Sequence, residues 1–297
     1  MRSLLDTPTD ALDDLASRSD PKGLAQLSLH LALLSATSLL VVVAWPSLWV
    51  LLAWIVHGCV LVFLFAPLHE CTHRTAFESR WMNDRVAGVC GAVLLLPANY
   101  FRAFHLAHHA HTQERERDPE LARPKPSTFR EYAYHVSGIP YALERMRTIA
   151  RHCLGQVDEP FIPASHAKIV VREARTLVGI YAGLAAASWW VGSLALLVYW
   201  LVPMAIGQPM LRLFLLAEHT QCALSGDPAH NTRTTGCGPF LRRLAWNMPF
   251  HREHHLFPSI PFHGLPAASR RLASLLPEPE RSYASFHRSL IARLIQR

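Results

Sequence analysis

Two long stretches with almost no charged residues stand out in the pattern of hydrophobic and polar residues. The first runs from Leu24 to Leu68 without an Asp, Glu, Lys or Arg, a length of 45 residues. A helix needs roughly 20 residues to cross a bilayer, so this stretch is long enough for two crossings. Trp45-Pro46-Ser47 interrupts it, and helices usually end before a proline. We therefore expect two membrane-spanning helices, at 24–44 and 47–68, joined by a tight turn.

The second stretch extends from Thr176 to Leu216 and contains one charged residue, Arg212. The segment Trp190-Val191-Gly192-Ser193 is a potential turn within it. This divides the stretch into two further expected spans, at 176–191 and 194–216. The pattern therefore predicts an all-α integral membrane protein with four transmembrane helices, folded as a single domain over residues 1–297.

The segments outside these spans are polar or too short to cross the membrane. Val86 to Ala98 is apolar over 13 residues, so it is expected to be re-entrant or interfacial. Residues 112–172 are polar and contain six prolines, which predicts short helices. We expect segments 69–175 and 217–297 to form a helical cap on one membrane face.

The distribution of positive charge predicts which face this is. The segments 1–23, 69–175 and 217–297 contain 3, 15 and 10 of the 29 Lys and Arg residues. The two turns expected on the opposite side contain none. Loops rich in Lys and Arg stay in the cytoplasm, so both termini and the cap are predicted to be cytoplasmic.

Composition narrows the function further. The net charge of +7 is spread along the chain without a nucleic-acid-binding motif, so anionic lipid headgroups are the expected partner of the basic residues. The six cysteines show no C-x-x-C spacing, and we predict neither a disulfide framework nor an iron–sulfur site. The acidic start, Met1 to Asp20, does not resemble a secretory signal and is expected to be a short cytoplasmic tail.

The candidate chemistry lies in three histidine boxes. His69 and His73 are four residues apart, and the spacing H-x-x-H-H occurs twice, at His105, His108, His109 and at His251, His254, His255. On a helix, positions i, i+3 and i+4 share a face. Each box therefore directs its imidazoles to one side, and all three are expected on the same membrane face.

Imidazole binds zinc, copper, iron and nickel, so the residue type alone does not name the metal. Eight histidines exceed the three or four ligands of one zinc site and suit two metals that keep open positions. Beside a hydrocarbon phase, such a centre suits oxygen activation against an unactivated C–H bond, with iron as the expected metal. His111 falls off the shared face of its box, whereas His219, at the end of the last span, could enter as a ninth ligand.

Other classes of protein compete with this interpretation. His69-Glu70-Cys71-Thr72-His73 also matches H-E-x-x-H, in which the glutamate is the general base of a zinc metalloprotease. That enzyme would need a further ligand, and the predicted spans contain no Asp or Glu. A carboxylate-bridged di-iron bundle would need two Glu-x-x-His motifs, and the chain offers one, Glu70 to His73. A non-catalytic lipid- or metal-binding membrane protein stays open.

The boxes and their neighbours resemble the membrane fatty acid desaturase and hydroxylase superfamily over roughly residues 50 to 270. Three further motifs resemble those of this family: Asn83-Asp84 with Gly88, Asp118-Pro119-Glu120 and Glu218-His219. The segments on either side of the third box, Asn247-Met248-Pro249-Phe250 and Phe257-Pro258-Ser259-Ile260-Pro261, resemble bacterial acyl-lipid desaturases. The resemblance implies a centre of two Fe2+ ions with O2 as co-substrate. The implied ligands are His69, His73, His105, His108, His109, His219, His251, His254 and His255.

Two departures limit what can be transferred. Stearoyl-CoA desaturases carry an Asn four residues before the extra histidine, and this chain has Leu215 there. The short tails leave no room for a fused cytochrome b5 domain, so we expect electrons from a separate ferredoxin, rubredoxin or cytochrome partner.

Residues near the boxes are candidates to orient the ligands or contact substrate. Ligating histidines usually donate their other N–H to a carboxylate or carbonyl, and the nearest polar groups in sequence are Glu70, Asp84, Asp118, Glu218, Asn247 and Glu253. Gln208, Arg212 and His219 fall on one helix face, which we expect to border a substrate channel. An ionisable residue inside a span is usually functional, and Arg212 is expected to contact an anionic headgroup or a nearby acid.

The sequence thus predicts O2-dependent desaturation of the acyl chain of a fatty acid or lipid. Hydroxylation of a lipid or other hydrocarbon chain on the same centre is an alternative, because histidine spacing does not control the fate of the carbon radical. Carotenoid ketolases and hydroxylases have similar boxes, and the intramembrane zinc metalloprotease is the alternative from another class.

Overall fold

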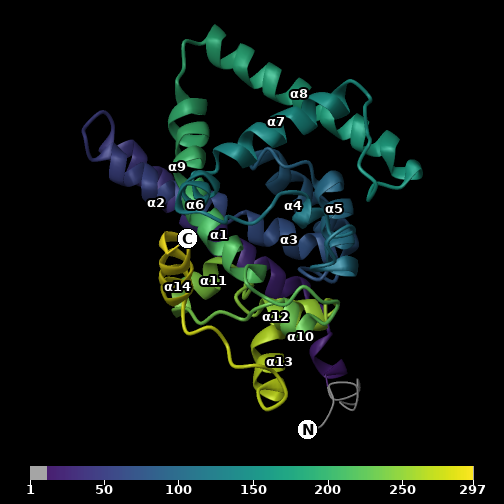
Figure 1. Ribbon diagram of the computed structural model, residues 1–297. Coiled ribbons are helices and arrows are strands. Elements are labelled where there is room, and N and C mark those ends of the chain that lie inside the picture. Colours follow the sequence, from purple (N-terminus) through teal and green to yellow (C-terminus); the bar gives the residue numbers. More distant parts are fainter. Residues whose placement is uncertain (1–11, 297) are drawn as a thin grey trace.

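The computed structural model describes residues 12–296, and this part of the chain is all-helical (Figure 1). It contains no strand, and one isolated bridge pairs Thr235 with Glu280. Most of the N-terminal tail expected from the sequence lies outside the described residues. The all-α prediction is confirmed.

The first uncharged stretch forms a helical hairpin. Helix α1 (Asp20–Ala44) begins four residues before the predicted span, where the Ser19 hydroxyl accepts a hydrogen bond from the Lys22 N–H at 3.4 Å. It ends before Trp45-Pro46, as the proline predicts. Helices α2 (Val50–Val62) and α3 (Phe65–His73) then follow almost without a break and together form one apolar segment. This segment carries the first histidine box at its end.

The short apolar segment at 86–98 contains a sharp bend. Helix α4 (Arg80–Val93) and helix α5 (Ala98–His111) meet there at 104°. The pair is either a broken span or a re-entrant loop. The bend turns the chain back, so that the second box, in α5, lies near the first box at the end of α3. Beyond α5 come η4 (Pro119–Ala122), α6 (Phe129–Val136) and α7 (Ile139–Cys153), the short helices that the prolines predict.

The second long stretch is arranged differently from the expectation. The predicted span 176–191 is the later part of a longer helix, α8 (Ala164–Trp190), whose first turns carry charged residues. The π-helix η5 (Leu197–Leu201) leads directly into α9 (Val202–His219), which ends at His219. The C-terminal region forms short helices that gather partly at one end of the molecule (Figure 1), namely α10 (Pro228–Asn231), α11 (Pro239–Leu244), α12 (His251–Leu256), α13 (Leu265–Leu272) and α14 (Tyr283–Ile295).

Several of these helices can cross a membrane. Within the described residues, three segments are long and apolar enough, Asp20–Ala44, Val50–His73 and Leu197–His219, and the bent pair α4 and α5 would be a fourth. Helix α8, which contains the expected span 176–191, is not among them, because charged residues accompany its apolar part. Large apolar side chains are exposed at both interhelical turns, including Trp49 at 73% and Trp190 at 89%. Tryptophan favours the boundary between lipid and water, so these turns suit a membrane interface.

Helices α2 and α9 approach closely because both carry glycine at the crossing. A Cβ atom on Gly58 would lie 2.1 Å from the Pro203 carbonyl oxygen, and one on Gly207 would lie 2.2 Å from the Gly58 carbonyl oxygen. Small residues allow membrane helices to pack backbone against backbone. This crossing holds the first box and His219 on adjacent helices.

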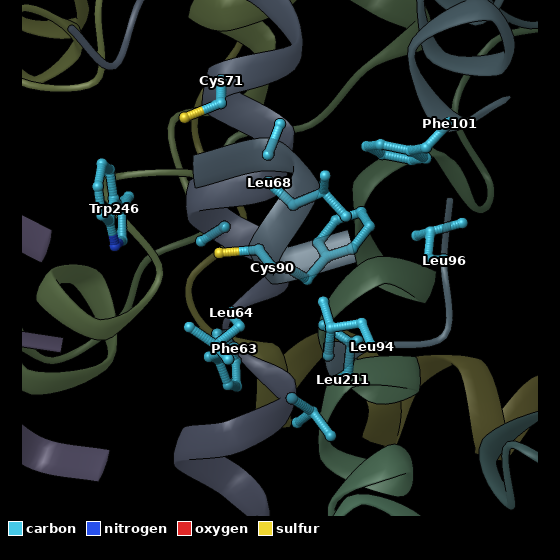
Figure 2. Close-up of a cluster of buried hydrophobic side chains, with 14 of the residues drawn as sticks. Phe63, Leu64, Leu68, Cys71, Cys90, Leu94, Leu96, Phe101, Leu211 and Trp246 are labelled. Atoms are coloured by element: carbon cyan, nitrogen blue, oxygen red, sulfur yellow. The ribbon is translucent and has the colours of Figure 1, made fainter. Parts of the chain in front are cut away.

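The main core surrounds the end of the α2–α3 segment. Figure 2 shows Phe63, Leu64 and Leu68 of this segment among Cys90 and Leu94 from the α4 region, with Leu96, Phe101, Leu211 and Trp246 nearby. All of these side chains are buried. Burying apolar surface stabilises the fold by roughly 25 cal/mol per Å². The core therefore fixes the ends of α3, α5 and α9 relative to one another.

Candidate metal centre

The histidine boxes meet because three helices end at the same place. Box residues occupy the last turns of α3 and α5, His219 is the last residue of α9, and the third box forms most of α12. The turn before α12 contains Asn247, whose φ of 61° is left-handed and whose side-chain amide donates to the Phe262 carbonyl at 2.9 Å. This turn directs the third box toward the other two.

Five imidazoles form a first group. The candidate ligand atoms of this group all lie within 4.8 Å of one another, and its members are His69, His73, His105, His109 and His254. The Nε2 atom of His73 is 2.8 Å from His105 Nε2 and 3.2 Å from His254 Nε2. Both ring nitrogens of His69 and the Nε2 of His109 are buried without a hydrogen-bond partner.

Four imidazoles form a second group beside the first. His108, His219 and His255 place their ligand atoms within 4.8 Å of one another. His251 joins them, because its Nε2 is 3.1 Å from the Nε2 atoms of both His219 and His255. His108 Nε2 lies 3.1 Å from His219 Nε2.

Hydrogen bonds on the far side of these rings determine which nitrogen carries the proton. His108 Nδ1 lies 2.9 Å from the Asp118 carboxylate, and His219 Nδ1 lies 3.2 Å from the Asn231 carbonyl oxygen. The Thr112 hydroxyl donates to the His108 carbonyl and so accepts from His255 Nδ1 at 3.2 Å. Each of these rings is therefore a donor at Nδ1 and presents an unprotonated Nε2 to its neighbours.

Unprotonated nitrogens this close together have no proton to share. Lone pairs that face one another at about 3 Å are repulsive unless a cation lies between them, and this separation is ordinary for two ligands of one metal. One of the two orphaned nitrogens of His69 and the orphaned Nε2 of His109 have the same explanation. The donor set therefore fits a metal centre with two adjacent positions.

The electrostatics of the third box favour the ligating form of histidine. Burial, with a contribution from neighbouring imidazoles, lowers the pKa of His254 to about 3 and holds the pKa values of His251 and His255 well below their usual range. Neutral imidazole is the form that binds metals. The box is thus already deprotonated at neutral pH.

The other residues singled out near the boxes divide into two sets. Asp118 contacts a box histidine, and the Glu218 carboxylate lies 3.5 Å from His251 Nε2. The remaining residues bind elsewhere: Glu70 accepts from Thr75 and from the Phe262 N–H, Glu253 pairs with Thr234, and Asp84 pairs with Arg74. His111 also lies apart, within 3.5 Å of Glu114 and hydrogen-bonded to Arg117.

A cavity of about 200 Å³ leads to the two groups. Its walls combine histidines of the centre with apolar side chains such as Phe65, Phe101 and Leu215. Arg212, Glu218 and His219 also line it, whereas Gln208 packs beneath Gly138 at the start of α7. Of the three α9 residues expected at a substrate channel, Arg212 and His219 line the cavity, whereas Gln208 does not and contacts Gly138 instead.

Sequence reasoning missed several residues that matter to this site. Tyr141 and Arg145 of α7 line the cavity, although they fall in the polar segment 112–172. Their i, i+4 spacing places them on one helix face, which was the available signal. The Thr112 hydroxyl and the Asn231 carbonyl orient ligand histidines, and nothing in the sequence marks a backbone carbonyl for that role.

Comparison with known proteins agrees with the site. The family model described as fatty acid desaturase matches residues 17–287. A Delta(12)-acyl-lipid-desaturase of Punica granatum is 36% identical over 85 residues, which cover 29% of this chain and 20% of that protein. A Delta(12)-fatty-acid desaturase of Arabidopsis thaliana is 30% identical over 94 residues, covering 32% and 23%, respectively. An sn-1 oleoyl-lipid 12-desaturase of Anabaena variabilis is 35% identical over 83 residues, covering 27% and 24%. The matched segments thus span about a quarter or less of each relative, while the family model covers most of this chain, and the chain belongs to the fatty acid desaturase family.

Proposed function

We propose that this protein is an O2-dependent di-iron oxidoreductase that desaturates the acyl chain of a fatty acid or lipid. The observation that carries the proposal is the pair of buried histidine groups whose Nε2 lone pairs converge at the end of a partly apolar cavity. In this proposal the first group holds one iron through His69, His73, His105, His109 and His254. The second group holds the other through His108, His219, His251 and His255.

The chain's own residues prepare the site in three ways. Bound iron would supply the O2 activation and hydrogen abstraction that no amino-acid side chain provides. Asp118, Thr112 and Asn231 hold ligand rings in the orientation and tautomer that leaves Nε2 free. Phe65, Phe101, Phe104 and Leu215 line the approach with apolar surface, which suits a hydrocarbon chain and excludes water from the reacting carbons.

The proposal places the centre at the cytoplasmic membrane face. The one-sided distribution of Lys and Arg supports cytoplasmic termini and a cytoplasmic cap with four spans. A ferredoxin, rubredoxin or cytochrome would then deliver electrons from that side. The basic residues Arg74, Arg80 and Arg102 near the first group suit an acidic donor.

Hydroxylation of a lipid and carotenoid oxidation stay as alternatives within the same chemistry. The metalloprotease alternative loses support at Glu70. Its carboxylate accepts hydrogen bonds from the Thr75 hydroxyl at 2.6 Å and the Phe262 N–H at 2.9 Å, and both partners are structural. Both hydrogen bonds end on Oε1 and tie that oxygen to the protein interior, and the match to the fatty acid desaturase family over residues 17–287 favours the desaturase.

The test is metal analysis combined with product profiling. Protein purified with iron should contain about two irons per chain and yield an unsaturated acyl product only with O2 and a reductant. His108→Ala should abolish the product while the protein still inserts into membranes, and His111→Ala, on the same helix but outside both groups, should stay active. One zinc per chain, or an active His108→Ala variant, would refute the proposal.

A further inference from the structure

The cavity carries more positive charge than its acids balance. Four cationic side chains line it, namely Arg123, Lys125, Arg145 and Arg212. Two of them have carboxylate partners, since Arg123 pairs with Glu144 and Lys125 pairs with Glu120. Within residues 12–296, Arg145 and Arg212 form no ion pair. Glu218 is the third acid of the wall and pairs with neither of these two arginines, so both guanidinium groups are available to a ligand.

Both unpaired arginines lie against one aromatic ring. The Arg212 guanidinium is 4.0 Å from the centre of the Tyr141 ring, and the Arg145 guanidinium is 5.3 Å from it. Arg145 also lies 4.8 Å from the centre of the Tyr100 ring. The rings hold both guanidinium groups in place through cation–π contacts, and the Tyr100 side chain also hydrogen-bonds Arg145.

Three nitrogens of the two guanidinium groups are buried without a hydrogen-bond partner. Arg212 is 8% exposed and its Nε has no hydrogen-bond partner; the same holds for Nε and Nη1 of Arg145. Burying a charged donor without a partner is costly, and a charge inside a membrane span is usually functional. Arg212 also does not extend to solvent, which excludes a purely interfacial role. The pair therefore has the charge and the free N–H donors of an anion-binding site.

The backbone fixes the two arginines relative to each other. Gly138, at the start of α7, has a φ of 74°, and a Cβ atom there would lie 2.6 Å from the Cβ of Gln208. Gln208 is one turn before Arg212 on α9, and Tyr141 and Arg145 share one face of α7. The contact between Gly138 and Gln208 thus brings the arginines of two different helices to the same ring.

We propose that Arg145 and Arg212 bind the anionic group at the polar end of the acyl substrate, a carboxylate or a phosphate. This inference rests on the proposed desaturase function and names its substrate class. Guanidinium groups match both anions because their N–H donors are arranged as a planar fork. Arg212 and His219 line the same cavity, and seven residues of helix separate them by about 10 Å along the axis. An anion held by the arginines leaves its hydrocarbon chain directed along the apolar wall toward the histidines.

A second hollow indicates where the rest of a headgroup would lie. It has a volume of about 620 Å³ and shares Arg123, Lys125, His135 and Glu144 with the first cavity. A phosphodiester would extend its remaining headgroup into this space, whereas a free carboxylate would not need it. Both sources present the same anion chemistry to Arg145 and Arg212, and they can be distinguished by experiment.

The test compares anionic and neutral ligands with the same chain. Oleate against methyl oleate tests the carboxylate, and dioleoylphosphatidylglycerol against dioleoylglycerol tests the phosphate; binding to the iron-loaded protein is measured in non-ionic detergent. Wild-type protein should bind at least one anionic ligand more tightly than its neutral counterpart. Arg145→Gln and Arg212→Gln should each weaken that ligand by about 10- to 100-fold, with unchanged iron content and unchanged affinity for the neutral ligand.

Arg130→Gln is the matched control, because Arg130 is exposed on α6 and lines neither the first cavity nor the second hollow. If Arg212→Gln does not fold, Arg145→Gln on the more accessible helix tests the same site. Equal wild-type affinity for anionic and neutral ligands, or an anionic preference that survives in the variants, would overturn the inference. Product formed equally from neutral and anionic lipids would refute this site and leave desaturation standing. Selective anion binding without any acyl oxidation would refute desaturation and leave the site standing.

Discussion

Replacing Asp118 by asparagine removes the negative charge behind His108 and keeps the size and shape of the side chain. Asp118 accepts three hydrogen bonds, from His108 Nδ1 at 2.9 Å, from the Gln113 N–H at 2.8 Å and from the Glu120 N–H at 2.9 Å. An asparagine has one oxygen, so at least one of these donors would face an amide NH2 group. Either the His108 ring loses the acceptor that fixes its tautomer, or residue 118 loses a hydrogen bond from the Gln113 or Glu120 N–H.

The expected effect follows from the size of these interactions. A hydrogen bond to a charged acceptor contributes about 1.5 to 3 kcal/mol, and loss of such a partner behind a ligand histidine typically costs 10- to 100-fold in metal affinity. We therefore expect Asp118→Asn to weaken the metal of the second histidine group by about that factor. The first group does not contain His108, so its metal should be held as in the wild type.

The assay is a competition between iron-loaded protein and a ferrous chelator, followed to equilibrium. In Asp118→Asn, one iron per chain should be released at a lower chelator concentration than the second iron. Asp84→Asn is the matched control, because Asp84 pairs with Arg74 at the surface with its side chain 50% exposed, and such pairs contribute little. A titration of Asp118→Asn that superimposes on the wild type would refute the argument that Asp118 fixes His108.

Three further outcomes are expected. Gly58→Ala should lower the stability in detergent by about 1–3 kcal/mol, because its Cβ would lie 2.1 Å from the Pro203 carbonyl oxygen. Gly179→Ala, whose Cβ would have no neighbour within 4 Å, is the control; equal melting temperatures for the two variants would argue against the close crossing. The metal-free protein should lose stability as pH falls below about 6.5, because His254 takes up a proton in the unfolded chain but not in the folded protein, where its pKa is about 3. This residue contributes at most about 1.4 kcal/mol per pH unit to the slope of stability against pH. A pH titration of the unfolding free energy should show a smaller slope for His254→Gln. Acyl chains of two lengths should be oxidised at the same position counted from the anionic end if Arg145 and Arg212 anchor that end, and a position constant from the methyl end would contradict this.

The sequence by itself determined the residues of the centre more completely than the course of the chain. Histidine spacing on helices is a local property, so i, i+3 and i+4 positions indicated eight histidines that the structure brings together, and His111 lies apart from them. Charge-free length and the Trp45-Pro46 break likewise predicted the first helical hairpin. The second pair was less well predicted, because hydropathy does not show that the apolar residues 176–191 continue a helix begun at Ala164.

Only the tertiary structure decided how the nine histidines divide and which polar groups serve them. Asp84 and Asp118 are equally plausible neighbours in sequence, yet one pairs with Arg74 at the surface and the other with His108. The cavity wall likewise depends on α7 packing against α9 at Gly138, which brings Arg145 to Arg212 from a segment that sequence reasoning left without a role. Periodicity describes one helix at a time, whereas a hydrogen-bond partner or an unpaired charge depends on which helices meet.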